Sequence, residues 1–481
     1  MNALHKKDPI NNPITEGVIW KQILLFFFPL LLSSFFQQLY NTADAVIVGQ
    51  AAGKEALSAV AGSAGSVLSI FLFFYTGFAS GAAVLAAQFF GAKKYSALRD
   101  TVRLSLILSA ILGLLGLMIC FFLAGPILRA MGAPAETMDA SFHYLRIIAL
   151  GMVASSLYNM GAAVLRALGD VRSPLYILIG TCLANIALDL AFVAVLKMGA
   201  PGAALATALC QLLSMAAVLI CLRRTLRLLS ASAAAPAGPG FREQPALSDP
   251  ITAKHRRRSR SDPRDLCHRI LRVGLPLGLA EVMYTFANLI LMAVVNGFGT
   301  DTVAAYGAYG RIDAIFWMIV GSFGIAITTF VGQNIGAGKR DRVFQCIRDC
   351  SVMMFLVLGI VIAILYIFSP AFLRLFTTDA EVLRIGVGMM HFLMPFYFLY
   401  IPIEILFSAL RGMGDSLIPT IITFFGVCIL RSAWGLFAVP LHHTPNMVLA
   451  GFPVTWIVTS VAFFFYFRWY VRHHMPAADS V

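Results

Sequence analysis

The stretch that decides the fold is Phe26–Gly49, FFFPLLLSSFFQQLYNTADAVIVG, a membrane-length apolar segment that also contains a carboxylate and several amides. At about 100° per residue, its polar side chains fall within roughly one third of a helix circumference. A charged side chain at a bilayer centre costs about 2.5–3.5 kcal/mol on insertion scales, so this stripe is expected to face protein or a wet cavity. Pro29 removes a backbone hydrogen bond and predicts a bend. The polar residues of the stripe are Ser34, Gln37, Gln38, Asn41 and Asp44.

Composition predicts an all-α polytopic membrane protein. The chain has 481 residues, of which 59% are hydrophobic and 12% charged, and its mean hydropathy is +0.83. At roughly 20 residues per span, the apolar runs give about twelve helices, and alternating strand-type segments are absent. The predicted spans lie near 18–48, 56–88, 97–123, 138–164, 174–197, 201–222, 267–298, 302–333, 346–370, 381–409, 416–440 and 446–470.

The formal charge of +13 is distributed as in a membrane protein and does not indicate nucleic acid binding. Basic residues gather at alternate ends of the spans, so the positive-inside rule places both termini and the loop between spans six and seven in the cytoplasm. We expect a monomeric multi-pass protein in the lipid bilayer of the plasma membrane, or of the inner membrane in a Gram-negative cell. Examples of these basic residues are Lys93, Arg99, Arg166, Arg223, Lys339, Arg411 and Arg468.

An internal repeat organises the chain. The segment Gln88–Lys93, QFFGAK, recurs as QNIGAGK from Gln333, and 333 − 88 = 245. The segment LRALGDVRSP around Arg166 recurs as LRGMGDSLIP around Arg411, again at 411 − 166 = 245. The chain is therefore predicted to be two copies of one six-span unit.

The seventh span mirrors the first, with Pro276 matching Pro29 and Asn288 matching Asn41 at an offset of 247. An even number of spans per copy makes the repeats parallel, which predicts two six-helix bundles around a central cavity. The predicted domains are an N-lobe at 1–223, a flexible cytoplasmic linker at 224–263 that is rich in Ala, Pro and Ser, and a C-lobe at 264–481.

Glycines predict helix ends and close contacts. In the repeated turns, Gly169 and Gly414 each precede an aspartate and a proline, which is typical of a helix C-cap followed by a new helix. We expect these turns to act as a hinge or gate. Gly77 and Gly81 are four residues apart and predict close helix packing.

Candidate coupling residues lie in the first lobe. Asn185 and Asp189 share one face of the fifth span, and Thr207 adds a hydroxyl in the sixth. Two carboxylates in a low dielectric cannot both ionise cheaply, so Asp44 and Asp189 together are expected to accept a proton near neutral pH, and either could bind Na⁺. The alternative is structural: Asp189 hydrogen-bonds the backbone or caps a broken helix, and Asn185 and Thr207 only support packing.

Two acids stand out in the second lobe. Glu404 lies two helical turns before Arg411, as Asn159 lies before Arg166 in the first copy, and Glu281 shares a stripe with Asn288. Either acid could bind Na⁺ or attract a cationic substrate, while Glu281 could also face water near the cytoplasmic mouth. The residues predicted to line a substrate cavity are Gln37, Asn41, Asn159, Glu281, Asn288 and Glu404.

Enzyme signatures are missing from the sequence. It contains no HExxH, GxSxG or GxxxxGK[ST] motif, so hydrolysis and ATP-driven pumping have no visible machinery. We predict a protein that is not an enzyme, needs no cofactor, and draws its energy from a gradient of H⁺ or Na⁺.

The motifs together resemble those of the multidrug and toxic compound extrusion (MATE) family. The likeness rests on the run from Pro29 to Gly49, the Gln-x-x-Gly-Ala ends of the second and eighth spans, and the twin Leu-Arg-x-x-Gly-Asp turns. The resemblance implies a cation-driven antiporter that exports cationic amphipathic organic compounds. It also implies a cation or proton site at Asp44, Asn185, Asp189 and Thr207.

Two positions depart from the family pattern. Many members have an acid eight residues after the seventh-span proline, where this chain has Tyr284. Some sodium-coupled members have an aspartate eleven residues before the tenth-span arginine, where this chain has Tyr400. These departures shift the prediction of the ion site towards the first lobe.

The main hypothesis is a secondary multidrug exporter that exchanges H⁺ or Na⁺ for small organic cations by alternating access. A lipid-linked oligosaccharide flippase of the same superfamily is the alternative, although such proteins line the cavity with basic residues and the cavity candidates here are acids and amides. A passive channel or structural membrane protein would not need buried carboxylates in both lobes.

Overall fold

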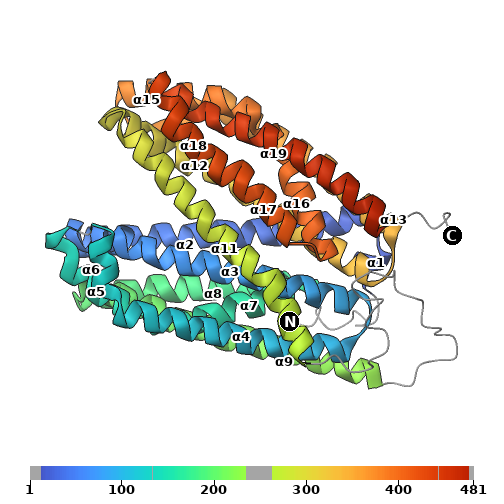
Figure 1. Cartoon of the computed structure of the whole chain (residues 1–481). Helices are drawn as coiled ribbons and strands as arrows, with labels where there is room; N and C mark the ends of the chain where they lie inside the picture. Colours follow the sequence, from blue (N-terminus) through green and yellow to red (C-terminus); the bar gives the residue numbers. More distant parts are fainter. Residues whose placement is uncertain (1–11, 133, 235–262, 443, 476–481) are drawn as a thin grey trace. The chain divides into compact units, whose positions relative to one another are not determined.

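The computed structural model describes residues 12–132, 134–234, 263–442 and 444–475, and its helices are shown in Figure 1. The described residues form helices and turns, and no β-strand occurs among them. In the part of the chain that the structure describes, eleven helices are long and apolar enough to cross a membrane, or twelve if one bent pair counts as a single span. The predicted all-α membrane-spanning fold is confirmed.

The helices of the first half are separated by short turns. They are α1 (Pro13–Glu16), α2 (Ile19–Ala61), α3 (Ser63–Gly91), α4 (Tyr95–Phe122), α5 (Ala124–Ala130), α6 (Met138–Ala149), α7 (Met152–Ala167), α8 (Arg172–Asp189) and α9 (Gly199–Ala234).

The second half repeats this arrangement. Its helices are α11 (Pro263–Asn296), α12 (Thr300–Gly336), α13 (Arg340–Ile367), α14 (Ser369–Arg374), α15 (Ala380–Leu393), α16 (Ile401–Met413), α17 (Leu417–Thr423), α18 (Leu430–Ala433) and α19 (Pro445–His474).

The helix α2 is longer than the first predicted span. Its backbone is helical at Pro29, where the bend stays a prediction, and the helix is interrupted at Gly53, with φ 83° and ψ −176°. Glycine adopts positive φ at little cost because it has no Cβ. The second span accordingly begins at Ser63 and not near residue 56.

The fourth predicted span, 138–164, is two helices. The pair Ala135–Ala149 and Met152–Ala167 is bent by 51°. A Cβ atom on Gly151, at the break, would lie 2.1 Å from Gln211 Oε1 and 3.2 Å from Ala208 Cα, so α9 occupies the space beside the bend. The matching tenth span, predicted as 381–409, is interrupted by a 3₁₀ turn, Met394–Leu399, which contains a proline.

The fifth and eleventh spans contain π-helical turns. One, Leu190–Val195, follows α8 directly. Two others, Phe424–Ile429 and Trp434–Ala438, lie on either side of α18. Such wide turns are rare and often occur at functional sites.

The repeated turns form the predicted helix ends. Gly169 has φ 93°, and Gly414, with φ 100°, caps α16. Asp170 Oδ1 then accepts hydrogen bonds from the backbone N–H of Arg172 and Ser173, at 3.2 and 3.0 Å, and so caps α8. The prediction of a C-cap followed by a new helix is confirmed, while the hinge or gate role stays a prediction.

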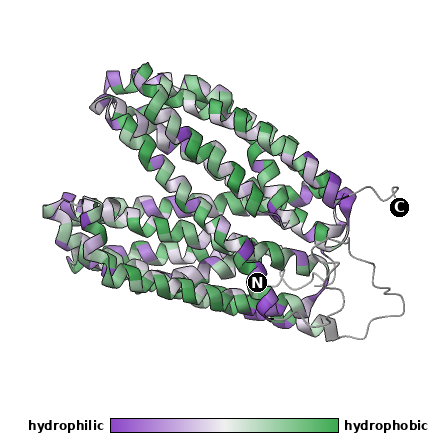
Figure 2. Cartoon of the chain, in the orientation of Figure 1, coloured by the Kyte–Doolittle hydropathy of each residue, from purple (hydrophilic) through white to green (hydrophobic). Residues whose placement is uncertain are grey.

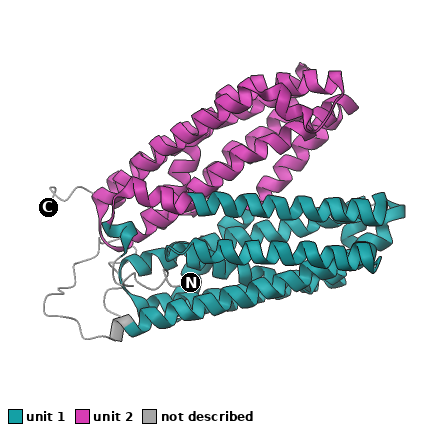
Figure 3. Ribbon diagram, turned by 180° about the vertical axis from the view of Figure 1, so that it is seen from behind, with its two compact units in different colours: residues 1–16, 28–244, 260–279 teal, residues 17–27, 245–259, 280–481 magenta. Residues whose placement is uncertain are grey.

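Two compact units divide the described chain, as Figure 3 shows. Unit 1 comprises the described residues of 1–16, 28–244 and 260–279, and unit 2 comprises those of 17–27 and 280–481. Each unit therefore includes a helical piece from the other half of the sequence. These boundaries follow packing, whereas the lobes predicted at 1–223 and 264–481 follow the repeat and stay a prediction.

The exchanged pieces are well packed inside their units. In unit 2, the ring of Phe27 stacks on Phe323 with centroids 4.3 Å apart. In unit 1, a Cβ on Gly81 of α3 would lie 2.5 Å from Gly274 Cα of α11, and one on Gly77 would lie 2.6 Å from the Leu277 carbonyl oxygen. The predicted close packing at Gly77 and Gly81 is confirmed.

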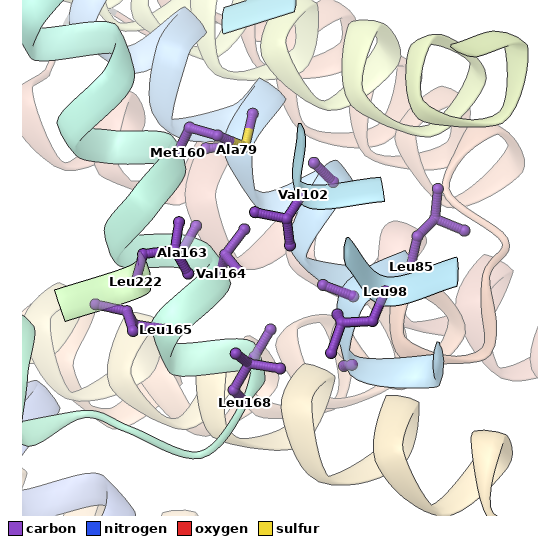
Figure 4. Packing of buried hydrophobic residues seen from close by; sticks show 14 of the residues in the cluster. Ala79, Leu85, Leu98, Val102, Met160, Ala163, Val164, Leu165, Leu168 and Leu222 are labelled. Carbon is purple, nitrogen blue, oxygen red and sulfur yellow. The ribbon is translucent and has the colours of Figure 1, made fainter. Parts of the chain in front are cut away.

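A hydrophobic cluster forms part of the core of unit 1 and is drawn in Figure 4. It brings Ala79 and Leu85 of α3, Leu98 of α4, Met160 of α7 and Leu222 of α9 together. All five side chains are buried. Small residues at such positions allow helices to approach closely where lipid gives no hydrophobic driving force.

Outside the cores, the helices present apolar surface. Figure 2 shows long hydrophobic stretches, with hydrophilic residues concentrated towards helix ends. Phe122 and Val195 are 65% and 75% exposed, as suits side chains that face acyl chains.

The linker prediction needs one correction. Residues from 224 were expected to be irregular, but α9 continues to Ala234, because its apolar side chains, such as the buried Leu229, still pack against unit 1. The next described helix, α11, begins at Pro263, and residues 235–262 lie outside the described part.

Candidate functional site

The polar stripe of α2 begins the candidate site. Gln37 and Asn41 are exposed, and Asp44 is half-buried. One helical turn before Asp44, the Tyr40 hydroxyl donates a hydrogen bond to Thr207 Oγ1, 3.3 Å away. This bond joins α2 to α9 within unit 1.

Asp189 lies at the end of α8, directly before the π-helical turn, and is fully buried. Its carboxylate is close enough to that of Asp44 for the two to interact directly. Asn185, one turn earlier in α8, is also fully buried. The structure therefore gathers residues predicted from three separate spans, and we name the set Asp44, Asn185, Asp189 and Thr207 the acid cluster.

The acid cluster contains buried polar atoms without hydrogen-bond partners. In the described part of the chain, Asp44 Oδ1, both Asp189 carboxylate oxygens and both side-chain polar atoms of Asn185 are buried and have no hydrogen-bond partner. Burying such groups unpaired is costly, so native sites supply a proton, an ion or water. Converging carboxylate, amide and hydroxyl oxygens are the ligands that hard cations prefer.

Asn159 has its hydrogen bonds within two neighbouring helices of unit 1. Its Nδ2 donates to the Ser155 carbonyl oxygen at 2.9 Å, and Thr76 Oγ1 donates to its Oδ1 at 3.3 Å. The bond from Thr76 joins α3 to α7, whereas the bond to Ser155 lies within α7. A substrate contact at Asn159 stays a prediction.

In unit 2, Glu404 and Arg411 share one face of α16, as their spacing predicted. Ser408 Oγ donates to Glu404 Oε1 at 2.9 Å, and Arg411 donates to Thr328 Oγ1 from Nε at 3.1 Å and from Nη2 at 2.9 Å. A Cβ on Gly324 would lie 1.9 Å from Glu404 Oε1. The glycine on α12 therefore makes room for this carboxylate.

Glu281 and Asn288 are exposed on α11. The Glu281 carboxylate interacts electrostatically with Arg411 and Glu404. Two acids and one base thus form a charged group in unit 2, and this group has a formal charge of −1 when all three are ionised.

Two ionisable residues of unit 2 were not predicted. Asp313 of α12 accepts hydrogen bonds from Trp317 Nε1 at 2.7 Å and from the Tyr397 hydroxyl. Arg431 of α18 is 2% exposed, and its guanidinium lies 4.1 Å from the centroid of the Phe452 ring. Both lie inside predicted spans, and a charge within a span is a signal that could have identified them.

No group of three or more His, Cys, Asp or Glu side chains in the described residues is placed to hold a metal ion. A sodium ion at Asp44, Asp189 or Glu404 would therefore depend on neutral oxygens beside these carboxylates. That possibility stays a prediction.

Comparison with known proteins identifies the family of the chain. The MatE family model matches residues 29–191 and 276–435. The chain is 28% identical over 462 residues to the "Probable multidrug resistance protein YoeA" of Bacillus subtilis (strain 168), and the match covers 94% of each chain.

Solved structures show the same fold. A crystal structure of MATE in complex with MaD3S has a TM-score of 0.80 at 23% identity, covering 96% of this chain and 98% of that one. A MOP superfamily transporter from Pyrococcus furiosus has a TM-score of 0.81 at 22% identity, covering 97% and 98%. Because the family model matches more than half of the sequence and covers both halves of the repeat, this chain belongs to the MatE family, the multidrug and toxic compound extrusion transporters.

Proposed function

We propose that this protein is a secondary active multidrug exporter, which exchanges H⁺ or Na⁺ for cationic amphipathic organic compounds by alternating access. Its family, and the name of its relative YoeA as a probable multidrug resistance protein, support export of many compounds. We further propose that it acts as a monomer in the plasma membrane, or in the inner membrane of a Gram-negative cell, with both termini in the cytoplasm.

The observation that carries the proposal is the acid cluster. Three buried carboxylate oxygens on Asp44 and Asp189 have no donor among the described residues. Two adjacent carboxylates repel each other when both are ionised, and a proton or Na⁺ removes that repulsion. The cluster therefore suits the binding and release of a small cation.

The position of the acid cluster connects ion binding to helix geometry. Asp44 belongs to α2, Asp189 precedes a π-helical turn, and Thr207 is hydrogen-bonded to Tyr40 of α2. Neutralising the carboxylates would let α2 and α8 approach, and deprotonation would separate them. A two-state arrangement of this kind is what ion-coupled alternating access requires.

The proposed substrates are cations because the charged group of Glu281, Glu404 and Arg411 has more acid than base. An intramembrane carboxylate attracts a cationic centre strongly when water is scarce. Further proposed contacts are the polar side chains of Gln37, Asn41, Asn159 and Asn288.

The test is efflux of ethidium from proteoliposomes under an imposed H⁺ gradient and, separately, an imposed Na⁺ gradient. We expect wild-type protein to move the dye against its concentration gradient under at least one of the two ion gradients, and an ionophore that collapses that gradient to stop it. Asp44→Asn should abolish this movement, because an amide cannot take up the proton and binds Na⁺ poorly.

The matched control is Asp100→Asn, since Asp100 is an exposed aspartate of α4. This variant should transport like wild type. Full gradient-driven efflux by Asp44→Asn would refute the proposed coupling site, and downhill movement only, in wild type, would indicate a channel.

A further inference from the structure

Arg431 of α18 is a buried cation in unit 2. Its side chain is 2% exposed, and α18 lies between two π-helical turns of the eleventh span. The Phe452 ring of α19 covers the guanidinium at 4.1 Å, and the Tyr284 ring of α11 lies 5.9 Å from it. Aromatic faces stabilise a cation but accept no strong hydrogen bond from its N–H groups.

The Tyr284 hydroxyl is a polar neighbour of the guanidinium and interacts with it. Nε and Nη2 of Arg431 and the Tyr284 hydroxyl are all buried, and in the described part of the chain none of them makes a hydrogen bond of normal geometry. None of the salt bridges among the described residues includes Arg431. An unpaired buried charge is costly and is normally compensated by an ion or ligand.

Asp313 interacts electrostatically with Arg431, but its carboxylate already accepts hydrogen bonds from other residues. Its Oδ2 accepts from Trp317 Nε1 at 2.7 Å, and its Oδ1 accepts from the Tyr397 hydroxyl. Tyr397 is held in turn by Tyr309, with the two hydroxyl oxygens 2.7 Å apart. This network satisfies the carboxylate without using the edge of Arg431.

The edge of Arg431 that is formed by Nε and Nη2 has the geometry that binds a carboxylate. In the same structure, Arg384 uses Nε and Nη2 to bind both oxygens of Glu381, at 3.0 and 2.5 Å. Arg348 also directs Nε and Nη2 at one carboxylate, that of Asp349. Two parallel N–H groups match a planar two-oxygen anion better than a spherical halide.

We propose that Arg431 binds the carboxylate of a transported compound through Nε and Nη2, with the Tyr284 hydroxyl as a further donor. The substrates then include aromatic acids and zwitterions as well as cations. This inference rests on the proposed function and deepens it, because it adds a chemical class of substrate recognised in unit 2.

The test measures binding alone, so that it can succeed or fail independently of ion coupling. Purified full-length protein in lipid nanodiscs is titrated with sodium benzoate at constant sodium, with chloride as the replaced anion, and its thermal unfolding midpoint is recorded. We expect a saturable rise with benzoate and none with benzamide, the neutral isostere. Arg431→Gln should weaken benzoate binding by about tenfold or more, because hydrogen bonds to a charged group are lost.

Two further variants make the result specific. Arg146→Gln is the matched control, because the Arg146 guanidinium also lies 4.1 Å from an aromatic ring, that of Phe121 in unit 1, and this variant should respond to benzoate like wild type. Arg431→Lys keeps the buried charge and is used if Arg431→Gln does not fold. It should bind benzoate more weakly than wild type, because the lysine ammonium lacks the two parallel N–H groups of a guanidinium.

Three outcomes would overturn the inference. The first is an equal response of wild type to benzoate and benzamide. The second is a stronger stabilisation by chloride than by benzoate, which would indicate a halide site. The third is unchanged benzoate affinity in both Arg431 variants. Benzoate binding without ion-driven efflux would refute the proposed function and leave this site standing.

Discussion

Asp313 shows how strongly one half-buried side chain can depend on its hydrogen-bond donors. Both of its oxygens accept hydrogen bonds, from Trp317 and from Tyr397, and Tyr397 is itself bonded to Tyr309. Removing the carboxylate would leave the half-buried indole N–H of Trp317 without its acceptor, and one hydroxyl of the Tyr309–Tyr397 pair without an acceptor. Each such orphaned group costs about 1–3 kcal/mol.

We therefore expect Asp313→Ala to lower the free energy of unfolding by about 2 kcal/mol or more. The apparent unfolding midpoint in nanodiscs should fall accordingly. Asp313→Asn should lose less, because its amide oxygen can still accept one of the two bonds. Asp301→Ala is the control, since Asp301 is exposed at the start of the same helix. Equal midpoints for Asp313→Ala and Asp301→Ala would show that the network contributes nothing.

Single residues also show what the sequence could predict. Asp44 and Asp189 were identified because each is an acid on a polar helix face inside a span, and the structure brings them together. Asp313 and Arg431 were missed although they too are charged residues inside predicted spans, where a charge is costly. Neither belongs to a repeated motif, and the burial of Arg431 depends on the packing of α18 against α19, which no local pattern encodes.

Among the elements, α3 and the start of α11 pack backbone against backbone within unit 1. Gly81 and Gly274 face each other so closely that a Cβ on Gly81 would meet the Gly274 Cα at 2.5 Å. Real Cβ atoms do not approach backbone atoms so closely, and two backbones cannot yield as a flexible side chain can. The helices would have to move apart.

Gly81→Ala should therefore destabilise the protein by about 1–3 kcal/mol, the usual cost of overpacking. Gly180→Ala should be neutral or slightly stabilising, because a Cβ there meets nothing within 4 Å and alanine favours a helix. The two apparent unfolding midpoints, measured side by side, check this. A Gly81→Ala midpoint at or above that of Gly180→Ala would contradict the packing argument.

The elements also mark the limit of periodicity as a guide. Hydropathy predicted about twelve spans and the approximate position of most of them, because an apolar run of that length has few alternatives. It did not predict the break at Gly151, where α9 takes the space beside the helix, or the long extension of α9 to Ala234. Both depend on packing between elements that are distant along the chain.

At the scale of the whole molecule, each unit is completed by the other half of the chain. Residues 17–27 belong to unit 2, where Phe27 stacks on Phe323 and Arg342 Nη2 donates to the Gly17 carbonyl oxygen at 2.7 Å. The described residues up to 279 of the second half belong to unit 1. Neither half of the sequence contains all of its own unit.

We expect residues 1–244 and 245–481, co-expressed as two polypeptides, to co-purify in the membrane. The second polypeptide alone should accumulate poorly, because unit 2 then lacks residues 17–27. Co-expression with 28–244 in place of 1–244 is the control. It should restore less of the 245–481 polypeptide to the membrane. If the amount of 245–481 in the membrane were the same with and without its partner, the exchange would have no role in stability.

The first part of α2 packs in unit 2 and the first part of α11 packs in unit 1, and this symmetry is consistent with an origin by gene duplication. The ionisable residues inside the spans show how far the two copies have since diverged. At the offsets of the repeat, Asp44 corresponds to Leu291, Asp189 to Trp434 and Arg431 to Ile186. The glycines that close the twin turns persist in both copies, while these ionisable positions do not. Both copies have thus kept the same helix ends, while each copy has its own charged residues. The loss of a charged residue from one half therefore cannot be compensated by the corresponding residue of the other half.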